Sequence, residues 1–293
     1  MAGWDILIDN DGNPILASGK AFSGRRLALK SGPNINHPIR AIVAGAKAFS
    51  DAYGDAANAI QTWRENSGDG GPHPHEAVRK FESLCYKTAE FFDAYAELPK
   101  SVVALRDPSF KEVFKEFTSL MKKCSRDWTL ICNKIKHNQN ILVVARYAYA
   151  NLFETVEVFS LWKPVGADSL EINIDLHKGH SRSTPLAIAM RQVVHDLVRT
   201  DRAAAKLIGA LPDDASAKSI SNLEIKLRVG SPMQVVENWP LWRTGDSSAM
   251  VDTFTRSANV LHSVRVPTYR QRQAAKVTFV FQGDGITRTF PII

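Results

Sequence analysis

The residue types best suited to chemistry lie in one short stretch, residues 132–140, where a long apolar pattern ends. Asn133 and His137 are four residues apart, and in a helix that spacing places two side chains on one face. A histidine exchanges protons near neutral pH, and a neighbouring amide can hold a phosphate oxygen or a 2′-hydroxyl. Lys134 and Lys136 would attract a phosphodiester, and RNA cleavage through its own 2′-hydroxyl needs no metal. The plainer alternative is a polar helix end whose lysines are favoured by the helix dipole.

The stretch from Cys132 to His137 resembles the motif of the HEPN superfamily, an arginine separated by four to six residues from a histidine. In this match His137 takes the place of the catalytic histidine, and Asn133 takes that of the polar residue that often follows the arginine. The resemblance implies a helical, usually dimeric protein that needs no metal or other cofactor. Many family members are endoribonucleases of bacterial toxin–antitoxin and phage-defence systems, and others are inactive proteins that bind RNA or nucleotides.

The match departs from the family at Cys132, which stands where the arginine belongs. A neutral thiol cannot supply the permanently charged, bidentate fork with which an arginine holds a phosphate. Arg126 lies on nearly the same helical face as His137, but about three turns away at ~1.5 Å per residue. We therefore expect Arg126 to hold the RNA backbone and not the same phosphate. The departure favours a catalytically silent RNA-binding relative, and the rival interpretation is a non-catalytic scaffold subunit that packs against a partner protein.

The composition agrees with a globular protein that meets anions. The 293 residues carry a formal net charge of +7 and a pI near 9.3, which favours nucleic acid as a partner. No run approaches the ~18 apolar residues of a membrane span, and the beginning of the chain lacks the pattern of a signal peptide. The three cysteines have no paired spacing. We expect a cytoplasmic protein without membrane contact.

Apolar residues at three- and four-residue steps predict long helices. Turn formers at residues 66–75 separate the first two, and Pro99 is expected to end the second. The predicted helices cover residues 38–65, 76–98, 108–137 and 186–211. Short links between long helices favour a bundle with antiparallel neighbours.

Segments rich in β-branched and aromatic residues predict strands between and around these helices. The first is an N-terminal hairpin of residues 4–8 and 14–17, closed by the Asp-Gly pair of residues 11–12. The others cover residues 141–149, 153–162, 170–176 and 223–229, with a closing hairpin at 276–290. Residues 232–243 look irregular, and residues 249–266 alternate only in pieces.

These elements predict a mainly α-helical fold, a HEPN-like helical bundle with small antiparallel β-elements at the N-terminus, mid-chain and C-terminus. Residues 1–37 would form the hairpin and a connector. Residues 38–211 would form the bundle, with a β-insert at 141–176. Residues 212–293 would be a mixed, β-rich segment packed on the bundle.

Three further groups of residues have a functional and a plain interpretation. The first group is Arg191, His195 and Asp196. Its functional interpretation is a second acid–base pair, and its plain interpretation is a cluster on the surface of a helix. The turn at residues 177–182, with His177 and His180, touches phosphate or is a solvated loop. The closing segment from Tyr269 to Arg288 is a nucleic-acid face or carries charges on the open side of a strand.

Metal sites and the common nucleotide or hydrolase motifs are not expected. The carboxylates of residues 9–13 favour a turn, because Lys20 stands where a calcium loop needs its glutamate. His73 and His75 are read as part of a solvated loop. No P-loop, GxSxG, HExxH or CxxC pattern is present.

Overall fold

The structure is a computed structural model. It describes residues 5–27, 38–66, 74–101, 108–148, 155–165, 169–177, 183–215, 217, 219–239, 242–243, 250–257, 259–267, 269–270, 277–280 and 287–290. The described chain is mainly helical, with small strand elements near the N-terminus, in mid-chain and in the C-terminal region. The predicted mainly α-helical class with small β-elements is thereby confirmed.

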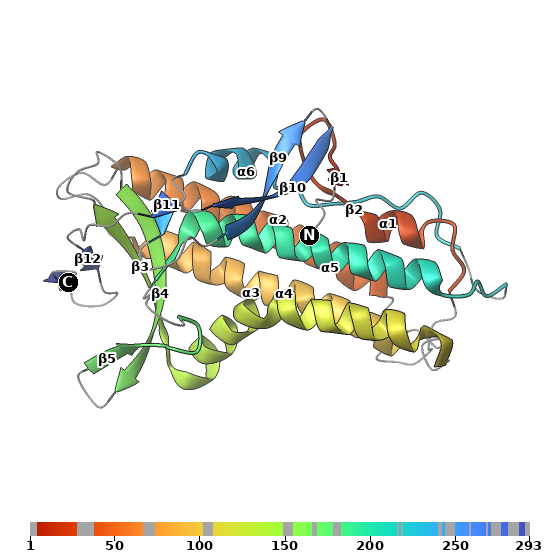
Figure 1. The fold of residues 1–293 in the computed structure, drawn as a ribbon, viewed down its shortest axis with the longest axis horizontal. Coiled ribbons are helices and arrows are strands. Elements are labelled where there is room, and N and C mark those ends of the chain that lie inside the picture. Colours follow the sequence, from red (N-terminus) through yellow and green to blue (C-terminus); the bar gives the residue numbers. More distant parts are fainter. Residues whose placement is uncertain are drawn as a thin grey trace.

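Four long helices form a bundle, in which α2 packs on α3, α3 on α4 and α4 on α5 (Figure 1). They are α2 (Pro38–Asn66), α3 (His75–Ser101), α4 (Lys111–Asn138, preceded by the 3₁₀ turn η2, Pro108–Phe110) and α5 (Leu186–Ala210). All four helices predicted from the apolar periodicity are present. Only the end of α3 was predicted wrongly, because Pro99 lies inside the helix. A proline so close to the helix end removes a single backbone hydrogen bond, and the chain continues helically to Ser101.

Aromatic side chains fill the centre of the bundle between α2 and α3. Phe49 lies 5.7 Å from Tyr53 and 6.2 Å from Phe91, measured between ring centroids, and all three are fully buried. Gly45 makes this close contact possible, because a Cβ there would lie 2.6 Å from Cδ2 of Phe91. Such large buried rings contribute strongly to core stability and hold the two helices in register.

A sheet with the strand order β13-β12-β3-β4-β5 stands at one end of the bundle (Figure 1). Its strands are β3 (Ile141–Ala148), β4 (Thr155–Val165), β5 (Ser169–Ile172), β12 (Val277–Val280) and β13 (Thr287–Phe290), and β6 (Thr184–Pro185) also pairs with β4. The closing hairpin is thus confirmed. The strand predicted for 170–176 ends at Ile172, because the Asn173 side chain accepts the backbone N–H of Asp175 at 3.0 Å and turns the chain.

The two strands and the turn of the predicted N-terminal hairpin are present, but the prediction that the strands pair with each other was wrong. β1 (Asp5–Leu7) pairs with β10 (Val260–Pro267), which pairs with β9 (Met250–Ser257), while β2 (Ile15–Leu16) pairs with β7 (Ile225–Lys226). Between β1 and β2 only the bridge from Ile8 to Pro14 forms. Asp9 closes the turn by accepting the backbone N–H groups of Asp11 and Asn13, but the segments then leave for different partners. Residues 17–22 continue as the short helix α1 (Ala17–Phe22).

Two further differences follow from long-range packing in the C-terminal third. The strand predicted for 223–229 shrinks to β7, since its partner β2 is only two residues long. The segment predicted as irregular contains α6 (Gly230–Glu237), followed by β8 (Trp242–Arg243), which pairs in parallel with β11 (Tyr269–Arg270). Gly230 is required at the start of α6, because a Cβ there would lie 2.3 Å from the Asp11 carbonyl oxygen.

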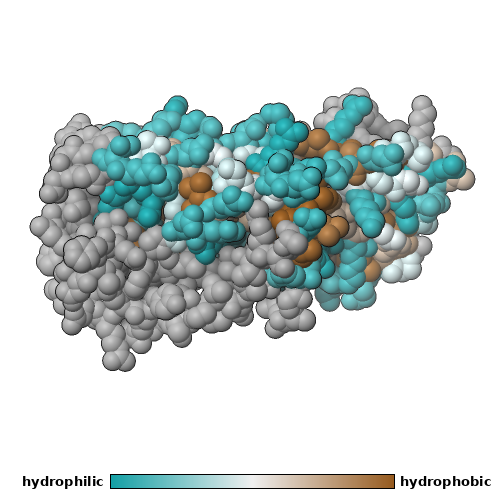
Figure 2. Space-filling view, turned by 90° about the horizontal axis from the view of Figure 1, so that it is seen from above, coloured by the Kyte–Doolittle hydropathy of each residue, from teal (hydrophilic) through white to brown (hydrophobic). Residues whose placement is uncertain are grey.

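The described part of the face that carries α1 and α6 is mostly hydrophilic, with hydrophobic side chains in small separate patches (Figure 2). Within the described ranges, no helix is long and apolar enough to cross a bilayer. The buried hydrophobic side chains instead form one core cluster shared by the helices and the inner strands.

Candidate functional site at the end of helix α4

The predicted site lies at the C-terminal end of α4, where the helix stops beside the sheet. Gln139 adopts a left-handed conformation with a φ of 52°, and the backbone N–H of Asn140 donates to the carbonyl of Lys134 at 3.2 Å. A left-handed residue that returns the chain in this way is a common helix terminator. The buried side chain of Asn140 accepts a hydrogen bond from the Asn173 amide at 2.8 Å, which fixes the exit from α4 against the segment after β5.

Asn133 and His137 are both exposed on the solvent face of this last part of α4. Their spacing of four residues places them one turn apart, as the sequence predicted. Within the described part of the chain, neither side chain makes a hydrogen bond or an ion pair. The amide and the imidazole are therefore available to an external ligand.

Lys134 and Lys136 are less available than the sequence suggested. The Nζ of Lys134 lies 2.7 Å from the Asp175 carboxylate, an ion pair that ties the end of α4 to the turn after β5. The Nζ of Lys136 lies 4.8 Å from the centroid of the Tyr86 ring on α3, within the range of a cation–π contact. Both lysines remain at the predicted place, but each already has an attractive partner.

Cys132 points into the bundle, with 4% of its surface exposed. Burial raises the pKa of the Cys132 thiol to about 12, so the group is neutral at physiological pH. Helical geometry explains its direction, because five residues at about 100° each turn Cys132 roughly 140° away from His137. His137 therefore faces solvent while Cys132 faces the core.

Arg126 is exposed on α4 and pairs with its neighbour Asp127 at 3.0 Å. It lies eleven residues before His137, which corresponds to an axial separation of about 16 Å. Arg126 and His137 therefore share a helix face but cannot contact one phosphate group together.

The second predicted cluster, on α5, is not a surface cluster. His195 and Asp196 are 2% and 9% exposed, and Arg191 donates to the carbonyls of Val236 and Glu237 at 3.1 and 2.7 Å. These carbonyls close the C-terminal end of α6, so the guanidinium fastens α6 to the bundle. Burial raises the pKa of Asp196 to about 7. The group holds two helices together and offers no open acid–base pair.

His177 is likewise buried and not part of a solvated loop. Its Nε2 accepts the backbone N–H of Leu161 at 3.0 Å, and burial lowers its pKa to about 4. The imidazole is thus neutral and serves as a hydrogen-bond acceptor for β4. Residues 178–182, which complete the predicted basic turn, lie outside the described part of the chain, as does His73.

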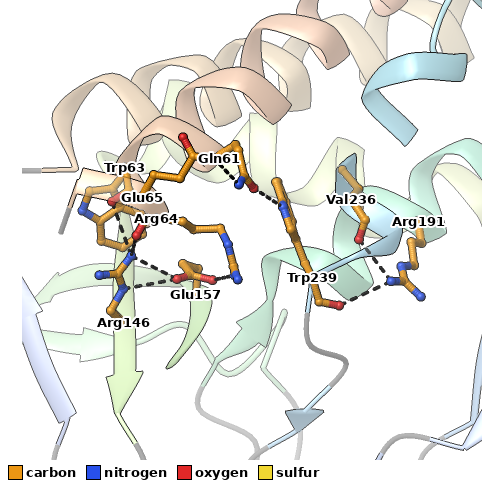
Figure 3. A network of polar contacts seen from close by, with 9 residues as sticks. All are labelled: Gln61, Trp63, Arg64, Glu65, Arg146, Glu157, Arg191, Val236 and Trp239. Atoms are coloured by element: carbon orange, nitrogen blue, oxygen red, sulfur yellow. Dashed lines mark hydrogen bonds and ion pairs between the residues drawn. The ribbon is translucent and has the colours of Figure 1, made fainter. Parts of the chain in front are cut away.

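Sequence reasoning missed a polar network around Glu157, which Figure 3 shows between α2 and the sheet. Glu157 is 3% exposed and pairs with Arg64 of α2 and with Arg146 of β3, whose Nε lies 3.2 Å away. Arg146 also donates to the carbonyl oxygens of Trp63 and Arg64, at 3.4 and 3.2 Å. Burial raises the pKa of Glu157, and the two arginines oppose this shift. The only sequence signal was a lone carboxylate inside the apolar strand pattern.

The same network continues toward α6 through Trp239 (Figure 3). The indole Nε1 of Trp239 donates to Gln61 at 2.7 Å, and the Arg64 guanidinium lies 5.8 Å from the Trp239 ring centroid. Trp239 also offers its carbonyl to Arg191 at 3.4 Å. These contacts bind the end of α2 to β3, β4 and the segment after α6. Each of these side chains is held by a group from another part of the fold, so we assign the network to stability.

Metal ligands do not gather in the described ranges: no group of three or more histidine, cysteine, aspartate or glutamate side chains is placed to hold an ion. The Asp9 carboxylate is used by the turn that it closes. Compared with known protein families, with curated proteins and with solved structures, the chain gives no match.

Proposed function

We propose that the protein is a HEPN-like RNA-binding protein that engages RNA at the C-terminal end of α4 and does not cleave it. The observation that carries this proposal is the buried, neutral thiol of Cys132 in the last turns of α4, where His137 is exposed. His137 is open to a ligand, while the position that should hold the scissile phosphate carries a buried thiol whose pKa is raised to about 12. A site of this kind retains contacts to RNA and lacks the charge that a cleavage transition state requires.

The exposed pair has suitable chemistry for such contacts. The Asn133 amide both donates and accepts, and the His137 ring carries two nitrogens, so both can bind phosphate oxygens or a 2′-hydroxyl. Phosphate and sugar contacts position RNA without reading its sequence. The net charge of +7 supports an anionic partner. The resemblance further implies that two copies pair, which sedimentation of the purified protein would measure.

Two measurements on the same set of variants test both parts of the proposal. Labelled RNA is incubated in EDTA with the wild type and with His137→Ala, and RNA affinity is measured by fluorescence anisotropy at low salt. The matched control is His262→Ala, because His262 also carries an accessible imidazole but lies on β10. We expect intact RNA in every sample, and an affinity that falls severalfold in His137→Ala only.

Two results would overturn the proposal. Cleavage by the wild type that disappears in His137→Ala would identify an active ribonuclease instead of a silent relative. Failure of the wild type to bind RNA at low salt would remove RNA from the function and leave the scaffold role, in which the helices pack against a partner protein.

A further inference from the structure

The solvent face of α4 carries a row of cations along its length. At about 100° per residue, Lys111, Lys115, Lys122, Arg126 and Lys136 fall within an arc of about 100°, and we call these five residues the basic stripe. All five are exposed. Asn133 and His137 lie in the same arc, and its remaining positions are threonine or serine. The arc contains no aspartate, glutamate or apolar residue.

On α2 and α3, by contrast, exposed lysines form ion pairs with acidic residues of the same helix. Lys47 of α2 pairs with Asp51 at 2.7 Å, and on α3 Lys87 pairs with Glu90 at 2.7 Å and Lys100 with Glu97 at 2.6 Å. Within the described ranges, Lys111, Lys115 and Lys122 have no ion pair. An ordinary solvated helix face carries both signs, as α2 and α3 do, so the basic stripe is a distinct feature of α4.

The stripe also works against the stability of its own helix. Lys111 and Lys115 are four residues apart, and so are Lys122 and Arg126, and like charges at this spacing repel each other. An anion that lies along the stripe would remove this repulsion. The row therefore favours a partner with a regular series of negative charges.

We infer that this partner is duplex RNA, whose phosphates lie along α4 from Lys111 to the Asn133–His137 pair; this inference rests on the proposed function. The arc has no apolar side chain, whereas a protein interface needs an apolar centre and a membrane-surface helix needs an apolar face. It also has no tyrosine, tryptophan or phenylalanine on which unpaired bases could stack. Contacts to phosphates and 2′-hydroxyls are the chemistry by which double-stranded RNA is recognised.

The length of the row fits an extended contact. Lys111 and His137 are 26 residues apart, which gives about 39 Å along the helix axis. A row of this length reaches phosphates well beyond those at the Asn133–His137 pair. Affinity should therefore depend on the length of the duplex, and a long duplex should bind more tightly than a short one.

The test compares two triple variants of the full chain that change the net charge equally. The stripe variant is Lys111→Gln, Lys115→Gln and Lys122→Gln. The control variant is Lys20→Gln, Arg40→Gln and Arg228→Gln, three exposed cations on other elements. Thermal unfolding confirms that both variants fold. Anisotropy then gives the affinity for duplex RNA of about 8 and about 20 base pairs, chosen to bracket the ~16 base pairs of known duplex-RNA domains, across a salt series.

We expect the stripe variant to lose about tenfold or more in affinity for the long duplex, while the control changes far less. The slope of log affinity against log salt should fall by about 3 in the stripe variant, since each phosphate contact contributes about one unit. Equal losses in the two variants, or displacement of the duplex by polyglutamate as readily as by unlabelled duplex, would overturn the inference. A loss in His137→Ala with no loss in the stripe variant would overturn it too and leave the proposed function standing. Absence of all RNA binding would instead remove the proposed function itself.

Discussion

Cys132 and His137 lie on opposite sides of α4, although only four residues separate them. The thiol is 4% exposed and packs with the core, while the imidazole faces solvent at the helix end. An arginine at residue 132 would have to fit a much larger side chain where the thiol packs in the core, with the carboxylates of Glu82, Glu90 and Asp93 nearby. The cysteine at this position is therefore part of the packing of the bundle and not a residue of its surface.

The variant Cys132→Arg would place an arginine at the position where the HEPN motif, which residues 132–137 resemble, has one. We expect it to reduce the free energy of unfolding by about 2 to 3 kcal/mol, because the larger side chain overpacks the core. Cys132→Ala should cost only about 1 kcal/mol, since it leaves a small cavity. Urea unfolding of both variants measures the difference. A fully stable Cys132→Arg protein would contradict the assigned orientation of this part of α4.

The inward orientation of Cys132 can be predicted from the sequence, because the spacing of the apolar residues of α4 shows which face of the helix is buried. The four long helices were predicted for the same reason, because their periodicity is long and unambiguous. The partners of Lys134 and Lys136 were not predictable in this way. Asp175 and Tyr86 come from other elements, and only the tertiary fold brings them to the end of α4.

In the N-terminal hairpin the local turn was predicted correctly, but the pairing of the strands was not. The turn at Asp9 was read correctly, because its carboxylate closes the turn by local hydrogen bonds. Strand pairing is decided by distant segments, however, and β1 and β2 find their partners more than 200 residues later. The buried Glu157 network has the same character, since Arg64 and Arg146 come from separate elements.

The second prediction follows from that network. Glu157→Gln removes the negative charge between two arginines that are each less than one fifth exposed. We expect the free energy of unfolding to fall by about 2 to 4 kcal/mol, because both guanidinium groups lose their counter-charge. Glu90→Gln is the matched control, since Glu90 pairs with Lys87 in an exposed setting and should cost less than about 1 kcal/mol. Equal losses of unfolding free energy for Glu157→Gln and Glu90→Gln in chemical denaturation would show that the buried network stabilises the fold no more than an exposed ion pair does.

The third prediction is a pH dependence caused by Asp196. Gln192 donates to its carboxylate at 2.9 Å, Cys124 and Trp128 of α4 also hydrogen-bond to it, and burial raises its pKa to about 7. Between pH 4 and 7 the folded protein keeps the Asp196 proton, whereas the unfolded chain releases it near pH 4. The free energy of unfolding is therefore highest at low pH and falls as the pH rises toward 7. From pH 5 to 8 the wild type should lose about 3 kcal/mol relative to Asp196→Asn, as measured by urea unfolding. Parallel pH profiles for the two proteins would contradict this assignment.

The fourth prediction has the opposite sign in an overlapping pH range. His177 is buried as the acceptor of the Leu161 N–H, and its pKa is lowered to about 4. Below about pH 6.5 the His177 side chain of the unfolded chain binds a proton, whereas the buried ring of the folded protein stays neutral. The free energy of unfolding therefore falls as the pH decreases from about 6.5 toward 4.

The variant His177→Gln can still accept the Leu161 N–H but does not titrate. Between pH 7 and 5 we expect the wild type to lose about 2 kcal/mol relative to His177→Gln. Nuclear magnetic resonance titration of the His177 ring gives an independent measure, since its signals should stay unchanged down to about pH 5. A ring that titrates near pH 6.5 would mean that His177 is solvated, and the basic turn would then return as a candidate phosphate contact.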